Sequence, residues 1–295
     1  MRQFVLEQQL DSKGCAVVEG KKYHYLSSVL RTVPGDMVYV RLPDGKLVQM
    51  TVAQVDSGKK RIVLQLAGDL TDAEDTVKAK PIAQNNGVEL WLFMFAAKPP
   101  KMDLVIRQAV ECGVSYVVPV KGTFCQKSCV EAASKKDERW SRIITEAREQ
   151  SGSPVNTKVL PLVSVEEMIS LWKNGLKSID CENGTACVNQ IKETEQAEAF
   201  AETVQESVAL VLYEQTKGTK ALHEACKAAG KIKKAAVVTG AEGGISPEEV
   251  ELMQKNGFIP VHFATNILRC ETAALYGIAA LQTVLMENGL WQFKE

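Results

Sequence analysis

Apolar and polar residues alternate along the first part of the chain in a way that is typical of short β-strands. The alternating segments are Met37–Leu42, Leu47–Val55 and Arg61–Leu66. An Asp-Gly pair, Asp44 and Gly45, lies between the first two and favours a tight hairpin turn. Short strands joined by tight turns predict a small β-barrel. One helical insert is expected at His24–Arg31, and its period places His24 and Arg31 close to the same side.

From residue 88 onwards, strand-like and helix-like segments alternate. The expected strands are Val88–Ala96, Ser115–Val120, Val208–Tyr213, Ala235–Thr239 and Phe258–Phe263. The expected helices are Met102–Cys112, Asp137–Gln150, Lys220–Ala229, Pro247–Asn256 and Glu271–Glu287. Gly113 suits the end of a helix, and Ser246 with Glu249 suits the capping box that begins one. The order predicts an α/β fold with a mainly parallel sheet.

We expect two domains, at residues 1–70 and 88–295, with a polar and acidic linker at 71–87. Residues 1–68 carry ten Lys and Arg against six Asp and Glu, whereas the remainder carries 25 against 30. A basic domain attached to an acidic one suggests a module that binds a polyanion, although a solvated surface can carry the same charge. The segment from about Lys173 to Glu206 is weakly periodic and is left unassigned.

Composition narrows the classes of protein. The densest apolar stretch, Leu90–Ala97, is far shorter than the roughly 20 residues that span a bilayer. The first residues lack the apolar core of a signal peptide, so we expect a cytoplasmic protein without a membrane partner. Eight scattered cysteines and three histidines show no metal-ligand spacing, so we expect reduced thiols and no metal site.

A glycine-rich segment, Thr239–Gly244, follows an expected strand and precedes the capped helix. Glycines let a ligand approach the main chain, and ligands of open α/β sheets lie beyond the carboxyl ends of strands. The segment lacks both the dinucleotide-binding pattern and the Lys-Ser/Thr ending of a phosphate loop. It is therefore either a ligand-binding loop of another kind or a turn that merely needs glycine.

A second segment, Ile267–Ala274, opens the last helix, and Arg269 and Glu271 lie at its entrance. Arg269 could hold a phosphate or an enolate-like oxygen, and Glu271 could equally be a partner of the helix dipole. Two further polar stretches are Ala97–Asp103, which contains Lys98 and Lys101, and Glu146–Ser151. Taken separately, those two favour a solvated surface.

Taken together, six motifs resemble the 16S ribosomal RNA uridine-N3 methyltransferases, a branch of the trefoil-knot (SPOUT) methyltransferases. They are His24–Arg31 with Gly35-Asp36, Lys98–Asp103, Glu111–Ser115, Glu146–Ser151, Gly240–Gly244 and Ile267–Ala273. The resemblance implies a C-terminal α/β trefoil-knot (SPOUT) domain with a small N-terminal PUA-like β-barrel. It implies S-adenosyl-L-methionine as cofactor and 16S rRNA, in the small ribosomal subunit, as partner. It also implies a homodimer, and DNA is not an expected partner.

Site residues follow from the resemblance. The expected cofactor-binding residues are Leu212, Tyr213, Gly240, Glu242, Gly243, Gly244, Phe263, Ala264, Ile267, Leu268, Thr272 and Ala273. The expected RNA-binding residues are His24, Arg31, Lys59, Lys60, Arg61, Lys98 and Lys101. We expect Arg269 to stabilise charge on the uridine carbonyl oxygens. Because no histidine lies in the matched loops, Glu271 is the first candidate for the proton acceptor and Glu242 the second.

The chain departs from the family pattern at five positions. Ala241 stands in place of a proline, Phe263-Ala264 in place of Leu-Gly, and Asn266 and Ser153 in place of basic residues. Ala264 requires a negative φ at that position and a methyl group that clears the ligand. Four alternatives stay open: a structural Arg269–Glu271 pair, a methyltransferase of another RNA site, a non-catalytic ribosome-binding module of the same fold, and a nicotinamide-dependent oxidoreductase.

Overall fold

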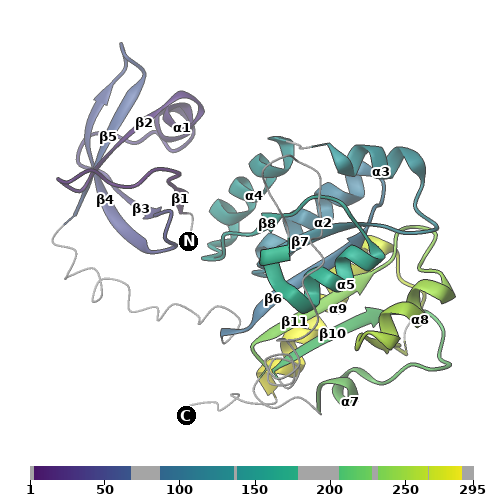
Figure 1. Cartoon of the computed structure of the whole chain (residues 1–295). Helices are drawn as coiled ribbons and strands as arrows, with labels where there is room; N and C mark the ends of the chain where they lie inside the picture. The colour runs from purple at the N-terminus through teal and green to yellow at the C-terminus, as the bar shows by residue number, and fades with distance from the viewer. Residues whose placement is uncertain are drawn as a thin grey trace. The chain divides into compact units, whose positions relative to one another are not determined.

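The computed structural model describes residues 3–67, 87–135, 138–178, 206–227, 232–264 and 266–287. The chain divides into two compact units (Figure 1). The first unit comprises Met1–Ile82 together with Thr145–Asn156, and the second comprises Ala83–Ile144 with Thr157–Glu295. The expected linker at 71–87 lies outside the described residues except for Gly87, as does most of the unassigned segment before Glu206.

The first unit is built on a five-stranded sheet of order β1-β3-β4-β5-β2. Its strands are β1 (Phe4–Val5), β2 (Cys15–Glu19), β3 (Met37–Arg41), β4 (Leu47–Asp56) and β5 (Arg61–Leu66). The expected hairpin is confirmed, because β3 and β4 pair antiparallel around Gly45, whose φ is +87°. Closure into a barrel is not confirmed: within residues 3–67 the sheet is a half-barrel with β1 and β2 at its edges.

The helical insert differs from the expected one. The α-helix α1 spans Gly20–His24 and continues as a π-helical turn, η1 (Tyr25–Val29), which buries Leu26. Arg31 lies beyond this turn with a φ of +54°. The expectation that His24 and Arg31 share one side of a regular helix is therefore wrong, because a π-turn and a left-handed residue change the angular spacing between them.

The second unit is an α/β layer around a parallel sheet of order β12-β10-β11-β6-β7-β8, with β9 also paired to β7. The strands are β6 (Glu89–Phe95), β7 (Tyr116–Lys121), β8 (Lys158–Val159), β9 (Val163–Ser164), β10 (Ser207–Leu212), β11 (Lys234–Thr239) and β12 (Ile259–Val261). The five strands expected from the sequence are confirmed, and the short strands β8 and β9 are additions to them.

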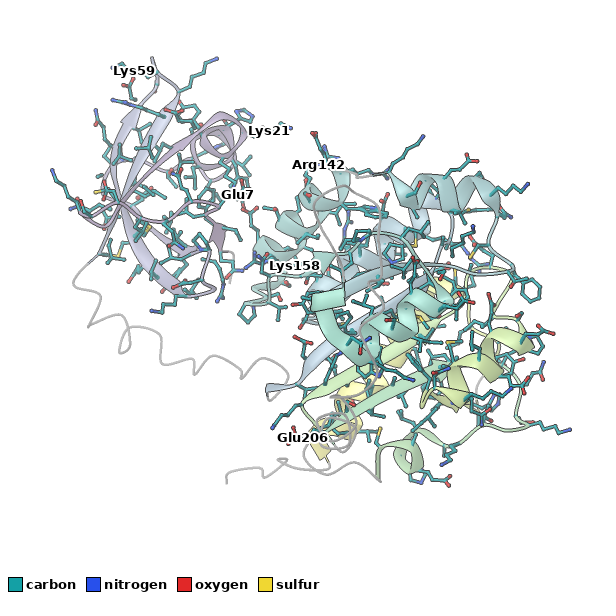
Figure 2. The ribbon with its side chains drawn as sticks, viewed as in Figure 1. Glu7, Lys21, Lys59, Arg142, Lys158 and Glu206 are labelled. Carbon is teal, nitrogen blue, oxygen red and sulfur yellow. The ribbon has the colours of Figure 1, made fainter. Side chains whose placement is uncertain are left out.

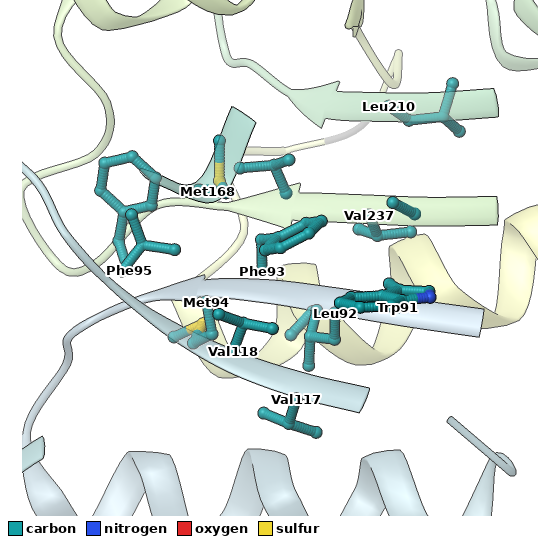
Figure 3. Close-up of a cluster of buried hydrophobic side chains, with 14 of the residues drawn as sticks. Trp91, Leu92, Phe93, Met94, Phe95, Val117, Val118, Met168, Leu210 and Val237 are labelled. Carbon is teal, nitrogen blue, oxygen red and sulfur yellow. The ribbon is translucent and has the colours of Figure 1, made fainter. Parts of the chain in front are cut away.

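Helices pack against this sheet. They are α2 (Pro99–Glu111), α3 (Lys127–Ser134), α4 (Glu138–Ser151), α5 (Val165–Asn174), η4 (Gly175–Ser178), α7 (Leu222–Lys227), α8 (Pro247–Lys255) and α9 (Cys270–Glu287). The helix α9 contacts α2, β6 and β11, whereas α5 contacts β7 and α8. Consequently β6 is buried along almost its whole length. Figure 3 shows its side chains together with Val117 and Val118 of β7, Leu210 of β10 and Val237 of β11.

Residues Thr145–Asn156 belong to the first unit. The Gln3 side chain donates a hydrogen bond to the Arg148 carbonyl oxygen at 2.7 Å, and the Val5 N–H donates to Glu149 Oε1 at 3.3 Å. Arg148 is only 6% exposed. The expectation of a solvated surface at Glu146–Ser151 is therefore wrong for Arg148, because this helix end packs against the first unit's own strands.

In the part of the chain that the structure describes, no helix is long and apolar enough to cross a membrane. No group of His, Cys, Asp and Glu side chains within those residues is arranged to hold a metal ion.

Candidate functional site

A cavity of about 550 Å³ lies in the second unit, where β10, β11 and β12 end. That volume falls within the range of small-molecule sites, and the carboxyl ends of parallel strands are where open α/β sheets bind ligands. The cavity is lined by Lys101, Leu212, Tyr213, Glu214, Thr239, Gly240, Ala241, Glu242, Gly243, Gly244, Ile245, Val261, His262, Phe263, Asn266, Ile267, Leu268, Arg269, Cys270 and Ala273. Segments far apart in sequence thus share one cavity because their strands are neighbours in the sheet.

The glycine-rich loop forms one wall of the cavity between β11 and α8. A Cβ atom at Gly240 would lie 2.8 Å from the backbone carbon of Gly244, and Gly244 itself has a φ of +77°. The loop therefore turns too tightly for side chains at these two positions. It ends in the expected capping box, in which the Ser246 side chain accepts from the Glu249 N–H and the Glu249 carboxylate accepts from the Ser246 N–H.

The expected cofactor-binding residues line this cavity except for Ala264 and Thr272. Among the described non-glycine residues, only Arg31 and Lys60 have a positive φ, so Ala264 meets the backbone condition set for it. Apolar side chains from two segments form part of the lining: Leu212 at the end of β10, and Phe263 and Leu268 between β12 and α9. The Phe263 ring packs edge-on against Tyr276 of α9, with 4.9 Å between ring centroids.

The two carboxylates expected near the reacting atoms are held by one ammonium group. Lys101 Nζ, from α2, lies 3.0 Å from Glu271 Oε2 and 3.5 Å from Glu242 Oε1. Glu271 also accepts a hydrogen bond from the Cys270 thiol at 3.2 Å. The structure therefore gives Glu271 the partners Lys101 and Cys270, rather than the Arg269 partner of the structural alternative.

These contacts alter the ionisation of the cluster. Burial acts to raise the pKa of Glu271, but hydrogen bonds from its own N–H, Lys101 and Cys270 outweigh it, so the pKa lies below its ordinary value. The same hydrogen bond to Glu271 raises the pKa of Lys101. Burial, with the hydrogen bond to Glu271, raises the pKa of the Cys270 thiol to about 11. At neutral pH the cluster thus holds an ionised Glu271, a charged Lys101 and a neutral thiol.

The expected catalytic residues are placed differently from one another. Arg269 and Glu242 line the cavity, whereas Glu271 lies outside its lining.

His262 lines the cavity too, and the sequence analysis missed it because it lies just before the matched loop. Its Nδ1 lies 3.2 Å from the Tyr213 carbonyl oxygen, and since a carbonyl only accepts, Nδ1 donates and Nε2 is left as an acceptor.

The expected RNA-binding residues divide between the units. In the first unit His24, Arg31, Lys59 and Lys60 are exposed, and Figure 2 shows Lys59 at the tip of the β4–β5 hairpin. Arg61 is half-buried, and its Nε lies 3.7 Å from Asp56 Oδ2. In the second unit the Lys98 side chain is exposed, whereas Lys101 lines the cavity.

Comparison with known proteins places the chain in a family. The model of the RNA methyltransferase domain matches residues 84–199 and 184–282. Ribosomal RNA small subunit methyltransferase E 2 of Borreliella burgdorferi is 27% identical over 292 residues, which cover 98% of this chain and 100% of that protein. Ribosomal RNA small subunit methyltransferase E of Bacillus subtilis is 24% identical over 298 residues, which cover 98% of this chain and 99% of that protein.

A solved structure supports the fold. Ribosomal RNA small subunit methyltransferase E from Neisseria gonorrhoeae, bound to S-adenosyl methionine, matches with a TM-score of 0.68 and 22% identity. The match covers 96% of this chain and 98% of that one. The family suggested by the sequence motifs is thus confirmed: this chain belongs to the RNA methyltransferase domain family, together with the ribosomal RNA small subunit methyltransferases E.

Proposed function

We propose that this chain transfers the methyl group of S-adenosyl-L-methionine to N3 of a uridine in 16S rRNA, with the assembled small subunit as substrate. The observation that carries the proposal is the cavity at the ends of β10, β11 and β12, which the motif loops of an RNA methyltransferase line. Its relatives over nearly the whole chain are named as methyltransferases of small-subunit ribosomal RNA.

The cavity suits this cofactor in shape and charge. The side chains of Leu212, Phe263 and Leu268 offer an apolar surface for an adenine ring. The tight turn at Gly240 exposes main-chain groups that can hydrogen-bond to ribose and carboxylate oxygens. Glu214 and Glu242 contribute negative charge that favours a cationic sulfonium. When bound, the cofactor supplies an electrophilic methyl group, so the protein has to position the uridine and remove its N3 proton.

Two residues would act on the uridine. Arg269 lines the cavity and would stabilise the charge that develops on the carbonyl oxygens when N3 loses its proton. Glu242 also lines the cavity, and we place it ahead of Glu271 as the proton acceptor. Glu271 is partly buried beside Lys101, and its lowered pKa makes it a poor proton acceptor. This order reverses the one expected from the sequence.

Uridine N3 is buried in a base pair, so the target must be unpaired or extruded before it reacts. The first unit would bind the RNA backbone through the exposed side chains of His24, Arg31, Lys59 and Lys60. Its half-barrel and the position of Lys59 at a hairpin tip are consistent with a PUA-like module. The net charge of −1 favours a substrate that offers shape as well as charge, which an assembled subunit does.

We also propose that the three loops that line the cavity form a trefoil knot. The chain would act as a homodimer in the cytoplasm. Packed against each other, α2 and α9 each carry an exposed large apolar side chain, Leu104 and Tyr276. Single exposed apolar side chains are common on monomers, so the dimer is proposed from the family resemblance, with these two side chains in its interface. Light scattering coupled to size-exclusion chromatography measures the mass directly; a monomer at micromolar concentration would contradict the dimer.

The decisive experiment is methyl transfer to small subunits that lack this modification. Labelled S-adenosyl-L-methionine should transfer its methyl group to 16S rRNA, and digestion to nucleosides should yield 3-methyluridine. Subunits bound without transfer would support a non-catalytic module, and a different methylated nucleoside would reassign the target. Calorimetric titration with the cofactor, and with NADH as control ligand, separates a failure of the cofactor site from a failure of RNA recognition.

A further inference from the structure

Lys101 is the meeting point of three segments of the second unit. It lies in the first turns of α2, and its ammonium group reaches Glu242 of the glycine-rich loop at 3.5 Å and Glu271 of α9 at 3.0 Å. It also lies 3.6 Å from the Cys270 sulfur. The side chains of Lys101 and Glu242 are about a quarter exposed, and that of Glu271 is 16% exposed. The resemblance alone had placed Lys101 among the RNA-binding residues.

We propose that Lys101 is a positioning residue for methyl transfer, which holds the Glu242 carboxylate in place at the cavity and is itself fixed by Glu271. This inference rests on the proposed function and gives each residue of the cluster a separate role. Glu242 faces the substrate, Lys101 orients Glu242, and Glu271 with Cys270 orients Lys101. Lys101 therefore does not contact RNA phosphates.

The charges around Lys101 argue for an internal role. A lysine gains RNA affinity by displacing counterions from phosphates, which requires an ammonium group that is free to pair with them. Lys101 already faces two carboxylates, so pairing with a phosphate would leave both of them without their cation. Lys98, three residues earlier, has an exposed side chain and is the better candidate for a phosphate contact.

Removal of the ammonium group would disturb Glu242 in two ways. Both carboxylates lie within 3.5 Å of one nitrogen atom, so without it two like charges repel each other across a small space. The Glu242 carboxylate also loses the cation that fixes its position at the cavity and keeps only the Lys98 N–H, 3.4 Å from Oε1, among its hydrogen-bond partners from α2 and the residue before it. Methyl transfer should thus slow in kcat, while the affinity for the subunit stays the same.

The test measures kcat and KM of Lys101→Met, Lys101→Arg and Lys98→Met on undermethylated small subunits at pH 7. For Lys101→Met we expect kcat to fall at least about tenfold and KM to stay nearly unchanged. Lys101→Arg keeps a cation and should restore most of the kcat of the wild type. Lys255→Met, on the exposed face of α8, is the neutral control.

Measurements of RNA binding distinguish a positioning role of Lys101 from a phosphate contact. We expect Lys101→Met to bind subunits with the affinity and salt dependence of the wild type, whereas Lys98→Met should reduce the slope of log K against log salt by about 1. If instead Lys101→Met lowers both the affinity and the slope, and leaves kcat unchanged, Lys101 is a phosphate contact and the inference is wrong.

A double-mutant cycle tests the cluster without any assay of activity. Lys101→Met, Glu271→Gln and the double variant are unfolded in urea at pH 7. We expect the effects of the two single changes to be non-additive, because each removes the same ion pair. Additive effects would overturn the inference. If the wild type transfers no methyl group while the cycle shows coupling, it is the proposed function that fails and not the arrangement of the cluster.

Discussion

His262 Nδ1 donates a hydrogen bond to the carbonyl oxygen of Tyr213 at 3.2 Å, and this contact joins the ends of two neighbouring parallel strands. Both residues line the cavity. A second link between the same segments is the Tyr213 N–H, which donates to the Val261 carbonyl oxygen at 3.0 Å. The loops after β10 and β12 are thus held as one wall by main-chain and side-chain hydrogen bonds.

Replacing His262 by Ala should weaken cofactor binding, because the wall loses one of the hydrogen bonds that hold it together. We expect the Kd for S-adenosyl-L-methionine, measured by calorimetry, to rise by about two- to tenfold, the range of a typical hydrogen bond. His262→Asn offers an N–H close to the place of Nδ1 and should bind nearly as the wild type does. Equal losses in both variants would mean that the imidazole touches the ligand itself.

Replacing Glu242 by Gln should lower kcat by about 10²-fold or more and weaken cofactor binding much less, because Glu214 keeps its negative charge at the cavity. The amide keeps the shape of the side chain but cannot accept the N3 proton, and general bases contribute about 10²–10⁴-fold. Glu271→Gln, which loses a contact outside the cavity lining, should have a smaller effect on kcat. A Glu242→Gln enzyme with normal turnover, beside an inactive Glu271→Gln enzyme, would restore Glu271 as the base.

Replacing Gly240 by Ala should abolish measurable cofactor binding. The added methyl group would lie 2.8 Å from the Gly244 backbone carbon, and since both atoms belong to the same tight loop, the loop must open. Gly58→Ala is the control, because the nearest atom to its new methyl group is a carboxylate oxygen 3.5 Å away. The thermal midpoint should show an intact fold in both variants, and calorimetric titration should show cofactor binding in Gly58→Ala but not in Gly240→Ala. Cofactor binding by Gly240→Ala would contradict this prediction.

Replacing Lys234 by Met should change how stability depends on pH in the alkaline range. Lys234 Nζ lies 4.1 Å from the ring centroid of Trp172, and burial lowers the pKa of this lysine to about 8. The folded protein therefore loses this proton near pH 8, whereas the unfolded chain keeps it up to the ordinary lysine value. Because the unfolded state binds more protons in that window, Lys234 makes stability rise with pH there.

The measurement is the urea midpoint of the wild type and of Lys234→Met at pH 7.5, 8.5 and 9.5. The wild type should gain stability relative to the variant as the pH rises. Groups present in both proteins, including the Cys226 and Cys270 thiols with pKa values raised to about 11, cancel in the difference. Lys233→Met, which removes an exposed neighbour, should show no such trend. A constant difference across the range would refute the assignment.

Local patterns were sufficient for much of the fold. The continuous apolar run that became β6 and the alternating runs that became β3 and β4 carry their periods in the sequence itself. The capping box at Ser246 and the turn at Gly45 depend on neighbouring residues alone, so both were predictable.

The burial of Arg148 could not be predicted from local patterns. A polar helix end usually faces solvent, and only the contacts of its segment with Gln3 and Val5 explain its burial.

The sequence by itself determined the alternation of strands and helices, the motif segments and the family to which they point. Only the tertiary structure decided which of those segments meet. Strand order places the ends of β10, β11 and β12 around one cavity, and that order depends on long-range packing that no local period encodes. The same packing brings Lys101 of α2 to Glu242 and Glu271, so a residue expected to bind RNA became part of the cavity's own charge cluster. The sequence shows which side chains are charged. Which charged side chains pair depends on the distance between them, and the fold determines that distance.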